Sequence, residues 1–114
     1  MSEVNGTYAC QNTQLLKQDL RGTLGFQGFV MSDWLATHSP EALADGLDQE
    51  QPGIIQLPFG TKWGVLVEKE LSKLDKTVRE TAAQHVLTAM FHVGLDREAG
   101  CTPPNCTQEP RLGR

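Results

Sequence analysis

A carboxylate and a large aromatic ring stand side by side where an apolar run of this sequence ends. The run Phe29–Met31 is followed at once by Ser32, Asp33 and Trp34. Parallel strands of α/β folds present their reactive groups at the carboxyl end, where the next loop begins. A carboxylate there can act on the anomeric carbon of a sugar, with the tryptophan ring stacked on the sugar's C–H face. In the alternative interpretation, Asp33 caps the following turn and Trp34 fills the core.

Three further polar residues could join Asp33 in chemistry. Asp48 and Glu50 follow the next short apolar segment, so either could approach Asp33 as a second acid; alternatively, they are a loop carboxylate and a solvated charge. His38 lies in the loop after Trp34, where it could contact a sugar or serve as a polar turn residue. A metal site is the weaker alternative, because a closed zinc site needs four converging ligands and no C-x-x-C or H-x-x-x-H spacing occurs.

The elements that must position these residues alternate between helices and short strands. Leucines at helical spacing follow a polar start, and an uncharged apolar run with glycines around it then favours a buried strand. Ser39, with proline and an acid after it, has the composition of a helix start. The pattern predicts, in chain order, a helix from Asn12 to Gly22, a strand over Phe26–Ser32, a short helix that opens at Ser39, a short strand over Gly46–Asp48 and a turn at Pro52–Gly53.

The second half of the chain is expected to be helical after a loop over Ile54–Lys62. Val65–Leu71 has helical character. The clearest element is Asp75–Val93, whose apolar residues recur every four positions and which a glycine follows. Other candidates in this half are expected to be structural: His85 and His92 at the edges of the buried stripe of the long helix, and Trp63 as the anchor of a helix.

The composition argues against several classes of protein. The chain has 114 residues, of which 39% are hydrophobic and 21% charged, so it can form one modest domain with a core. A net charge of −4 without a basic stripe argues against a nucleic-acid partner. No run of eighteen apolar residues suggests a membrane span. The N-terminus has neither the basic nor the apolar region of a signal peptide.

Three cysteines and two sequons bear on the cellular environment. Cys101 and Cys106 bracket a turn-rich Thr-Pro-Pro-Asn spacer, so a local disulfide between them is reasonable, and Cys10 is then left over. Asn5 and Asn105 each open an N-x-T sequence, which is a glycosylation site only in a secreted protein. Together these features favour a secreted parent protein.

The alternation of helices and short strands predicts an α/β architecture with parallel strands. Two or three strands cannot close a barrel, and a complete (β/α)8 barrel takes about 250 residues. We therefore expect either a piece of a larger domain or an unusually small α/β fold.

Three segments of the amino-acid sequence extend this interpretation. GFQGFVMSDW resembles the nucleophile segment of glycoside hydrolase family 3, the β-glucosidase and β-xylosidase family; THSPEALADGLDQEQPG and LDKTVRETAAQHVLTAMFHVGLD resemble its run to the eighth strand and its last barrel helix. The resemblance covers about Val4 to Asn105. It implies a helix-rich fragment of a TIM-type (β/α)8 barrel, about strands six to eight, with residues 1–96 as the C-terminal portion of the barrel domain and 97–114 as a linker-like tail.

The resemblance also implies a chemistry: hydrolysis of terminal non-reducing β-D-glucosyl residues by a retaining double displacement. Asp33 would be the nucleophile, Trp34 a wall of the sugar site, a β-glucoside or oligosaccharide the substrate, and no cofactor is implied. The intact enzyme would also need the missing barrel segments and a second domain, which would carry the general acid. The isolated chain is expected to be weakly active or inactive.

The sequence departs from the family pattern near the site. Leu35 stands where the family has glycine after the tryptophan, Gln49 and Gln51 replace methionines, and Ser2–Val4 replaces a Tyr-Asn pair. Two rival hypotheses remain: a non-catalytic carbohydrate-binding or interaction remnant, and a reading frame without selected function.

Overall fold

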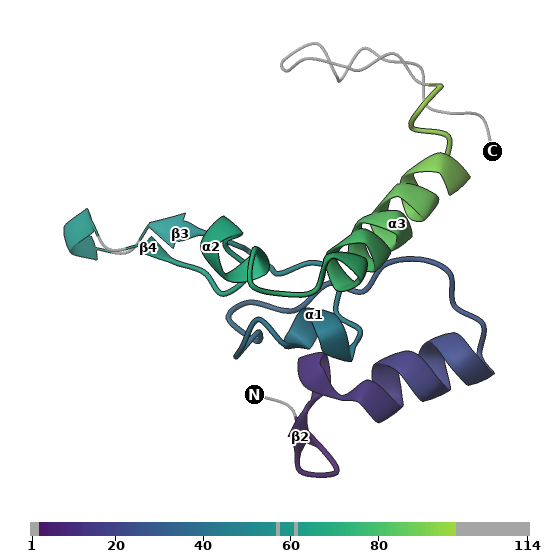
Figure 1. The fold of residues 1–114 in the computed structure, drawn as a ribbon, viewed down its shortest axis with the longest axis horizontal. Helices are drawn as coiled ribbons and strands as arrows, with labels where there is room; N and C mark the ends of the chain where they lie inside the picture. The colour runs from purple at the N-terminus through teal and green to yellow at the C-terminus, as the bar shows by residue number, and fades with distance from the viewer. Residues whose placement is uncertain (1–2, 57, 61, 98–114) are drawn as a thin grey trace.

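The computed structural model describes residues 3–56, 58–60 and 62–97 (Figure 1). Most of its elements are short, and only η2 and α3 exceed two turns. In chain order they are β1 (Glu3–Val4), β2 (Thr7–Tyr8), η1 (Ala9–Gln11), η2 (Gln14–Thr23), α1 (Ala42–Asp45), β3 (Ile55–Gln56), η3 (Pro58–Gly60), β4 (Lys62–Trp63), α2 (Glu68–Leu71) and α3 (Lys76–His92).

The predicted helices are present, but two are shorter than expected: α1 begins at Ala42 instead of Ser39, and α2 begins at Glu68 instead of Val65. The segment expected from Asn12 forms the π-helix η2, and the segment expected over Asp75–Val93 forms α3, which begins at an Asp75 cap. The carboxylate of Asp75 accepts a hydrogen bond from the Thr77 amide at 2.7 Å, as an N-cap residue should. Gly94 follows α3 with a φ of 78°, the left-handed conformation that a glycine adopts at a helix end.

Two antiparallel hairpins occur, and the second lies where we expected a loop over Ile54–Lys62. β1 pairs with β2 across a turn at Asn5 and Gly6, whose φ values of 51° and 73° fit the two-residue turn that favours an Asn-Gly pair. β3 pairs with β4, so that Trp63 lies opposite Ile55. Trp63 thus lies in a short strand, and its role as the anchor of a helix stays a prediction.

The two predicted parallel strands run in the expected direction but are reduced to a single bridge between Met31 and Gln49. The expectation that the first of them is buried was wrong, since Phe26 is 40% exposed and Met31 is 52% exposed. The Ser32 amide donates to the Gln49 carbonyl at 2.9 Å, and the Asp48 amide donates to the Val30 carbonyl at 2.9 Å. In the described part of the chain, no third strand pairs with either segment. The strands are short because neither has a second neighbour, and their assignment to particular barrel strands stays a prediction.

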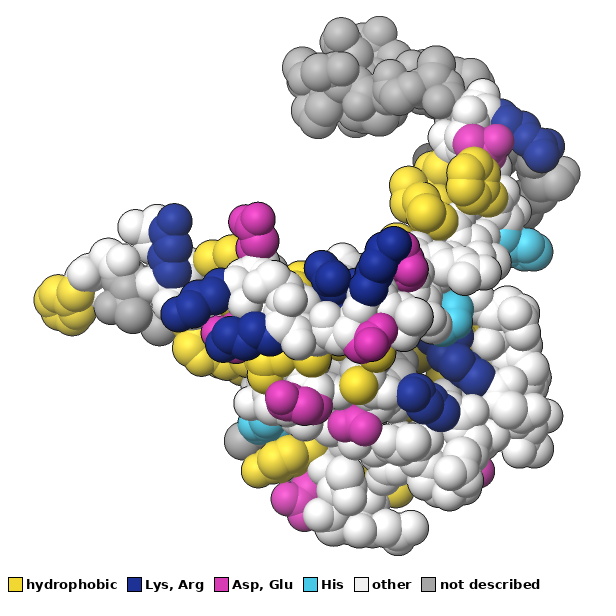
Figure 2. Space-filling model, viewed as in Figure 1, with side chains coloured by type: hydrophobic (Ala, Val, Ile, Leu, Met, Phe, Trp, Pro, Cys, Tyr) yellow, Lys and Arg dark blue, Asp and Glu magenta, His cyan; other side chains and the backbone are white. Residues whose placement is uncertain are grey.

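The core is small and lies where α1 and α3 meet near η2. Its buried apolar side chains are Leu16, Ala42, Leu43, Leu47 and Ala82. Apolar side chains are instead open to solvent at both extremities of Figure 2, near the end of α3 and at the tip of the β3–β4 hairpin. The radius of gyration is 16.6 Å, against roughly 13 Å for a compact domain of this length. None of the described helices is long and apolar enough to cross a membrane.

Candidate functional site

Asp33 and Trp34 lie exposed in one pocket at the end of the bridged segment. Trp34 is 64% exposed, so the alternative in which it fills the core was wrong for this structure. The pocket measures about 430 Å³, within the range of roughly 300–1,000 Å³ for small-molecule sites. Its lining comes from two segments of the chain: Tyr8, Ala9 and Cys10 from the N-terminal region, and Asp33, Trp34, Ala36 and His38 from the loop.

The backbone just before Asp33 is held in place. Ser32 is 2% exposed, and its hydroxyl accepts a hydrogen bond from the Gln51 amide at 3.0 Å while its own amide donates to Gln49. Among the described residues, the Asp33 carboxylate has no hydrogen-bond partner, so the capping interpretation has no support. A carboxylate on a fixed backbone, open to the pocket, can approach a bound ligand.

The turn after Trp34 is tight. The Ala36 amide donates to the Asp33 carbonyl at 3.2 Å, and Leu35 has a φ of 56°. This left-handed conformation suits glycine better than leucine. A glycine at position 35 would adopt this conformation without that steric cost.

His38 lies in the same pocket, stacked on Tyr8. The ring centroids are 3.8 Å apart and the planes differ by 23°. The backbone amide of His38 donates to Gln11 Oε1 at 3.2 Å. Gln11 Nε2 in turn donates to the Ser39 hydroxyl at 2.9 Å. His38 therefore belongs to the pocket. Sequence reasoning missed Tyr8 and Gln11, because the residues that they contact, His38 and Ser39, lie more than twenty residues away in the chain.

Asp48 is a buried structural carboxylate. Its side chain is 2% exposed, and Arg21 Nη2 lies 2.5 Å from Oδ2. The Val30 amide donates to the same oxygen at 2.7 Å, and His85 Nδ1 lies 2.7 Å from Oδ1. Both carboxylate oxygens of Asp48 have protein partners, and Asp48 does not line the Asp33 pocket. Asp48 is therefore not placed to act as a second acid. Nothing in the sequence pattern marked Arg21 as its partner.

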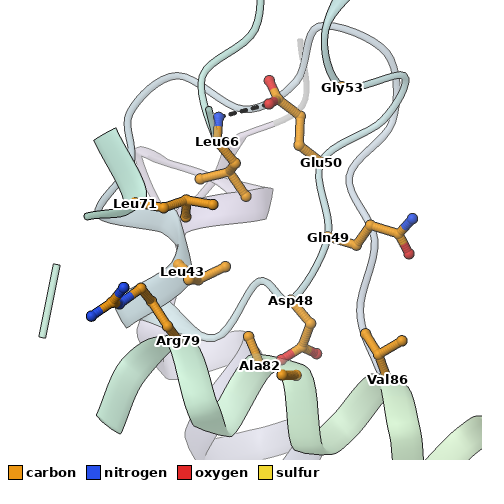
Figure 3. Close-up of a pocket in the computed structure, with 11 residues that line it drawn as sticks. Leu43, Asp48, Gln49, Glu50, Gly53, Leu66, Leu71, Arg79, Ala82 and Val86 are labelled. Carbon is orange, nitrogen blue, oxygen red and sulfur yellow. Dashed lines mark hydrogen bonds between the residues drawn. The ribbon is translucent and has the colours of Figure 1, made fainter. Parts of the chain in front are cut away.

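Glu50 is also buried, so its interpretation as a solvated charge was wrong. It is 8% exposed and accepts hydrogen bonds from the Val65 amide at 3.0 Å and the Leu66 amide at 2.7 Å. Figure 3 shows this carboxylate turned toward Leu66 at the rim of a second pocket of about 360 Å³. Gln49 lines the same pocket. Apolar side chains from α1, α2 and α3 make up most of its remaining wall.

The remaining candidates are spread over the molecule. His85 is partly buried against Asp48, whereas His92 is exposed near the end of α3. Asn5 is exposed in the first hairpin turn, and Cys10 is half-buried in the Asp33 pocket. Cys101, Cys106, Asn105 and most of the predicted tail lie outside the described residues. Within those residues, no group of three or more histidine, cysteine or acidic side chains could hold a metal ion.

Comparison with known proteins gives a consistent result, although no family model matches the chain. A probable β-glucosidase A from Neosartorya fischeri is 43% identical over 111 residues, covering 91% of this chain and 12% of the relative. A solved β-glucosidase from Chaetomella raphigera superposes with a TM-score of 0.72 at 31% identity, covering 85% of this chain and 14% of that one. A β-glucosidase from Streptomyces venezuelae, solved with D-glucose, gives 0.68 at 32% identity, covering 88% and 14%.

The chain thus spans about an eighth of the length of the relatives that it matches. The match includes the segment that carries Asp33, since it extends over nine tenths of the chain. The chain is therefore similar to one segment of larger proteins named β-glucosidase.

Proposed function

We propose that this chain supplies the nucleophile segment of a retaining β-glucosidase, with residues 1–96 as part of its barrel domain. The observation that carries the proposal is the exposed Asp33 carboxylate, which shares a pocket with Trp34 and follows a backbone fixed through Ser32. The relatives named β-glucosidase support the substrate class.

In the proposed reaction, the Asp33 carboxylate attacks the anomeric carbon and displaces the leaving oxygen. The attack joins the sugar to Asp33 as a covalent glycosyl ester. A carboxylic acid protonates the leaving oxygen and then, as its conjugate base, activates the water that cleaves the ester. In retaining enzymes the two carboxyl groups stand about 5–5.5 Å apart. Asp48 and Glu50 are engaged by protein partners, so neither is assigned as the acid, and we propose that another part of the parent enzyme supplies it.

An activated substrate tests the nucleophile without the acid. A 2,4-dinitrophenyl 2-deoxy-2-fluoro-β-D-glucoside needs no protonation of its leaving group, and its fluorine slows hydrolysis of the ester. We expect peptide mass spectrometry of the treated chain to find the fluoroglucosyl group on Asp33. Asp33→Ala should abolish labelling, whereas Asp19→Ala, an exposed control, should not. Labelling of another carboxylate, or labelling that survives Asp33→Ala, would overturn the assignment.

A second candidate is a non-catalytic carbohydrate-binding role. It is favoured by the exposure of Trp34 together with the engagement of both nearby carboxylates. It predicts sugar binding that Trp34→Ala weakens and Asp33→Asn leaves unchanged, without covalent labelling.

We also propose that the parent enzyme is secreted and glycosylated at Asn5. Asn5 and Thr7 are both exposed in the first hairpin, so a transferase could reach the sequon. Expression in a eukaryotic secretory host should add an endoglycosidase-sensitive mass to the peptide that contains Asn5. Asn5→Gln should remove that mass, and a secreted product without it would contradict the proposal.

A further inference from the structure

We propose that the stacked rings of Tyr8 and His38 form a second sugar-binding wall in the Asp33 pocket, which contacts a β-linked pyranoside and contributes to its selection. The inference rests on the proposed function, since it adds residues to the same site. Neither ring takes part in the proposed covalent step.

The first argument is placement. Tyr8 and His38 lie thirty residues apart in the sequence, yet both line the pocket that contains Asp33 and Trp34. A ligand that reaches the Asp33 carboxylate therefore enters a space with aromatic side chains from both segments. Pockets that bind small molecules combine such apolar surfaces with a few placed polar groups.

The second argument is chemical. Aromatic rings offer an apolar face for sugar C–H groups, and tyrosine and histidine also have polar atoms at the ring edge. Among the described residues, neither the Tyr8 hydroxyl nor the His38 ring nitrogens have a hydrogen-bond partner. Both residues are exposed, so these atoms can donate to and accept from sugar hydroxyls.

The third argument is rigidity before binding. Gln11 bridges the His38 amide and the Ser39 hydroxyl, and the side chain of Asn12 donates to the Val4 carbonyl at 2.9 Å. The second contact ties the β1–β2 hairpin, and Tyr8 with it, to the start of η2. A preorganised wall loses little conformational entropy when a ligand binds.

Binding of methyl β-D-glucopyranoside to the 114-residue chain tests the inference by NMR titration. We expect saturable shifts at Tyr8 and His38, and roughly three- to tenfold weaker binding for Tyr8→Ala and His38→Ala, as for the loss of one stacking contact or hydrogen bond. His92→Ala, in an exposed histidine on α3, should bind like the parent chain. Fingerprint spectra confirm that each variant keeps the fold. No binding, or unchanged affinity in both folded variants, would overturn the inference.

Cys10 offers a second readout because it lines the same pocket. Under reducing conditions, the glucoside should slow alkylation of Cys10 by iodoacetamide but not that of Cys101 or Cys106, as resolved by peptide mass spectrometry. In the Tyr8→Ala variant this protection should shrink. Equal effects of the glucoside on all three thiols would count against the wall.

Asp33→Asn separates this inference from the proposed function. If the glucoside binds Asp33→Asn with the same dependence on Tyr8 and His38, the wall stands whether or not Asp33 is labelled. If Asp33 is labelled but the affinity for the glucoside is unchanged in Tyr8→Ala and His38→Ala, the nucleophile assignment stands and the proposed wall is wrong.

Discussion

His85 Nδ1 lies 2.7 Å from Asp48 Oδ1 and ties α3 to the segment that bridges Met31 through Gln49. The other carboxylate oxygen of Asp48 contacts Arg21 and the Val30 amide. One buried side chain thus joins η2, α3 and the segment that leads to Asp33. Its partners make the burial of a charge tolerable, since an unpaired buried carboxylate is costly.

Asp48→Ala should destabilise the fold strongly. The substitution leaves Arg21 and the Val30 amide without their partner, and breaking a buried ion pair costs about 3–5 kcal/mol. We expect urea titration followed by circular dichroism to show loss of most or all of the folded population.

Glu80→Ala is the matched control. It also removes an acidic side chain that pairs with a cation, here Lys76 at 3.3 Å, but both partners are mostly exposed. Such pairs contribute about 0.5 kcal/mol or less. Equal losses of folding stability in Asp48→Ala and Glu80→Ala would contradict the structural role of Asp48.

Glu50→Ala should open the chain locally around residues 65 and 66. It leaves two amides without their acceptor, at a cost of about 1–3 kcal/mol for each buried group. Hydrogen exchange at Val65 and Leu66 should accelerate, while exchange inside α3 changes less. Glu50→Gln keeps one acceptor oxygen and should give an intermediate rate; unchanged protection in Glu50→Ala would contradict the contact.

The sequence predicts what is local in this fold and misses what is distant. α3 follows from a four-residue periodicity that one segment carries by itself. The burial of Asp48 does not, because its partners Arg21 and His85 lie 27 and 37 residues away, and no local pattern encodes such distances. Strand lengths also depend on neighbours, so the predicted segments shrink to the Met31–Gln49 bridge.

The candidate site divides in the same way. Asp33 and Trp34 are marked as candidates by their place after an apolar run, and both are exposed in the structure. The contribution of Tyr8 depends on the first hairpin. That hairpin has a sequence signal, the Asn5–Gly6 pair, which favours a two-residue turn, but strands of two residues are too short for alternation to reveal them.

Leu35→Gly should be tolerated far better than the same change elsewhere. Leucine pays about 1–2 kcal/mol for a left-handed conformation, and Leu35 has a φ of 56°. Leu24→Gly is the control, because Leu24 is also exposed but has an ordinary φ of −86°. We expect the free energy of unfolding to be about 1 kcal/mol higher for Leu35→Gly, the more stable variant, than for Leu24→Gly. The reverse order would contradict the strain.

Asp75 should make the stability of α3 depend on acid pH. The Thr77 hydroxyl, and then the Thr77 amide, donate to the Asp75 carboxylate and hold its pKa below the ordinary value. Because the pKa is lower in the folded state, the contribution is complete above the unfolded pKa of about 4 and is lost as the pH falls through the folded value. Asp75→Ala should therefore lower the Tm at pH 7, with a smaller difference at pH 2–3. Asp75→Asn, which caps without titrating, should keep more of the Tm at both values; a pH-independent deficit in Asp75→Ala would contradict the charged cap.

The isolated chain should unfold with weak cooperativity or associate in solution. Among the residues that the structure describes, five apolar side chains are buried, whereas large apolar residues such as Phe59, at 105% exposure, and Phe91, at 58%, face solvent. Exposed apolar surface of this kind favours self-association and dye binding. We expect 1-anilinonaphthalene-8-sulfonate fluorescence before any thermal transition, a broad transition, and a sedimentation coefficient that rises with concentration. A sharp transition of a monomer that does not bind the dye would show that the small core, with the Asp48 contacts, is sufficient to stabilise the chain.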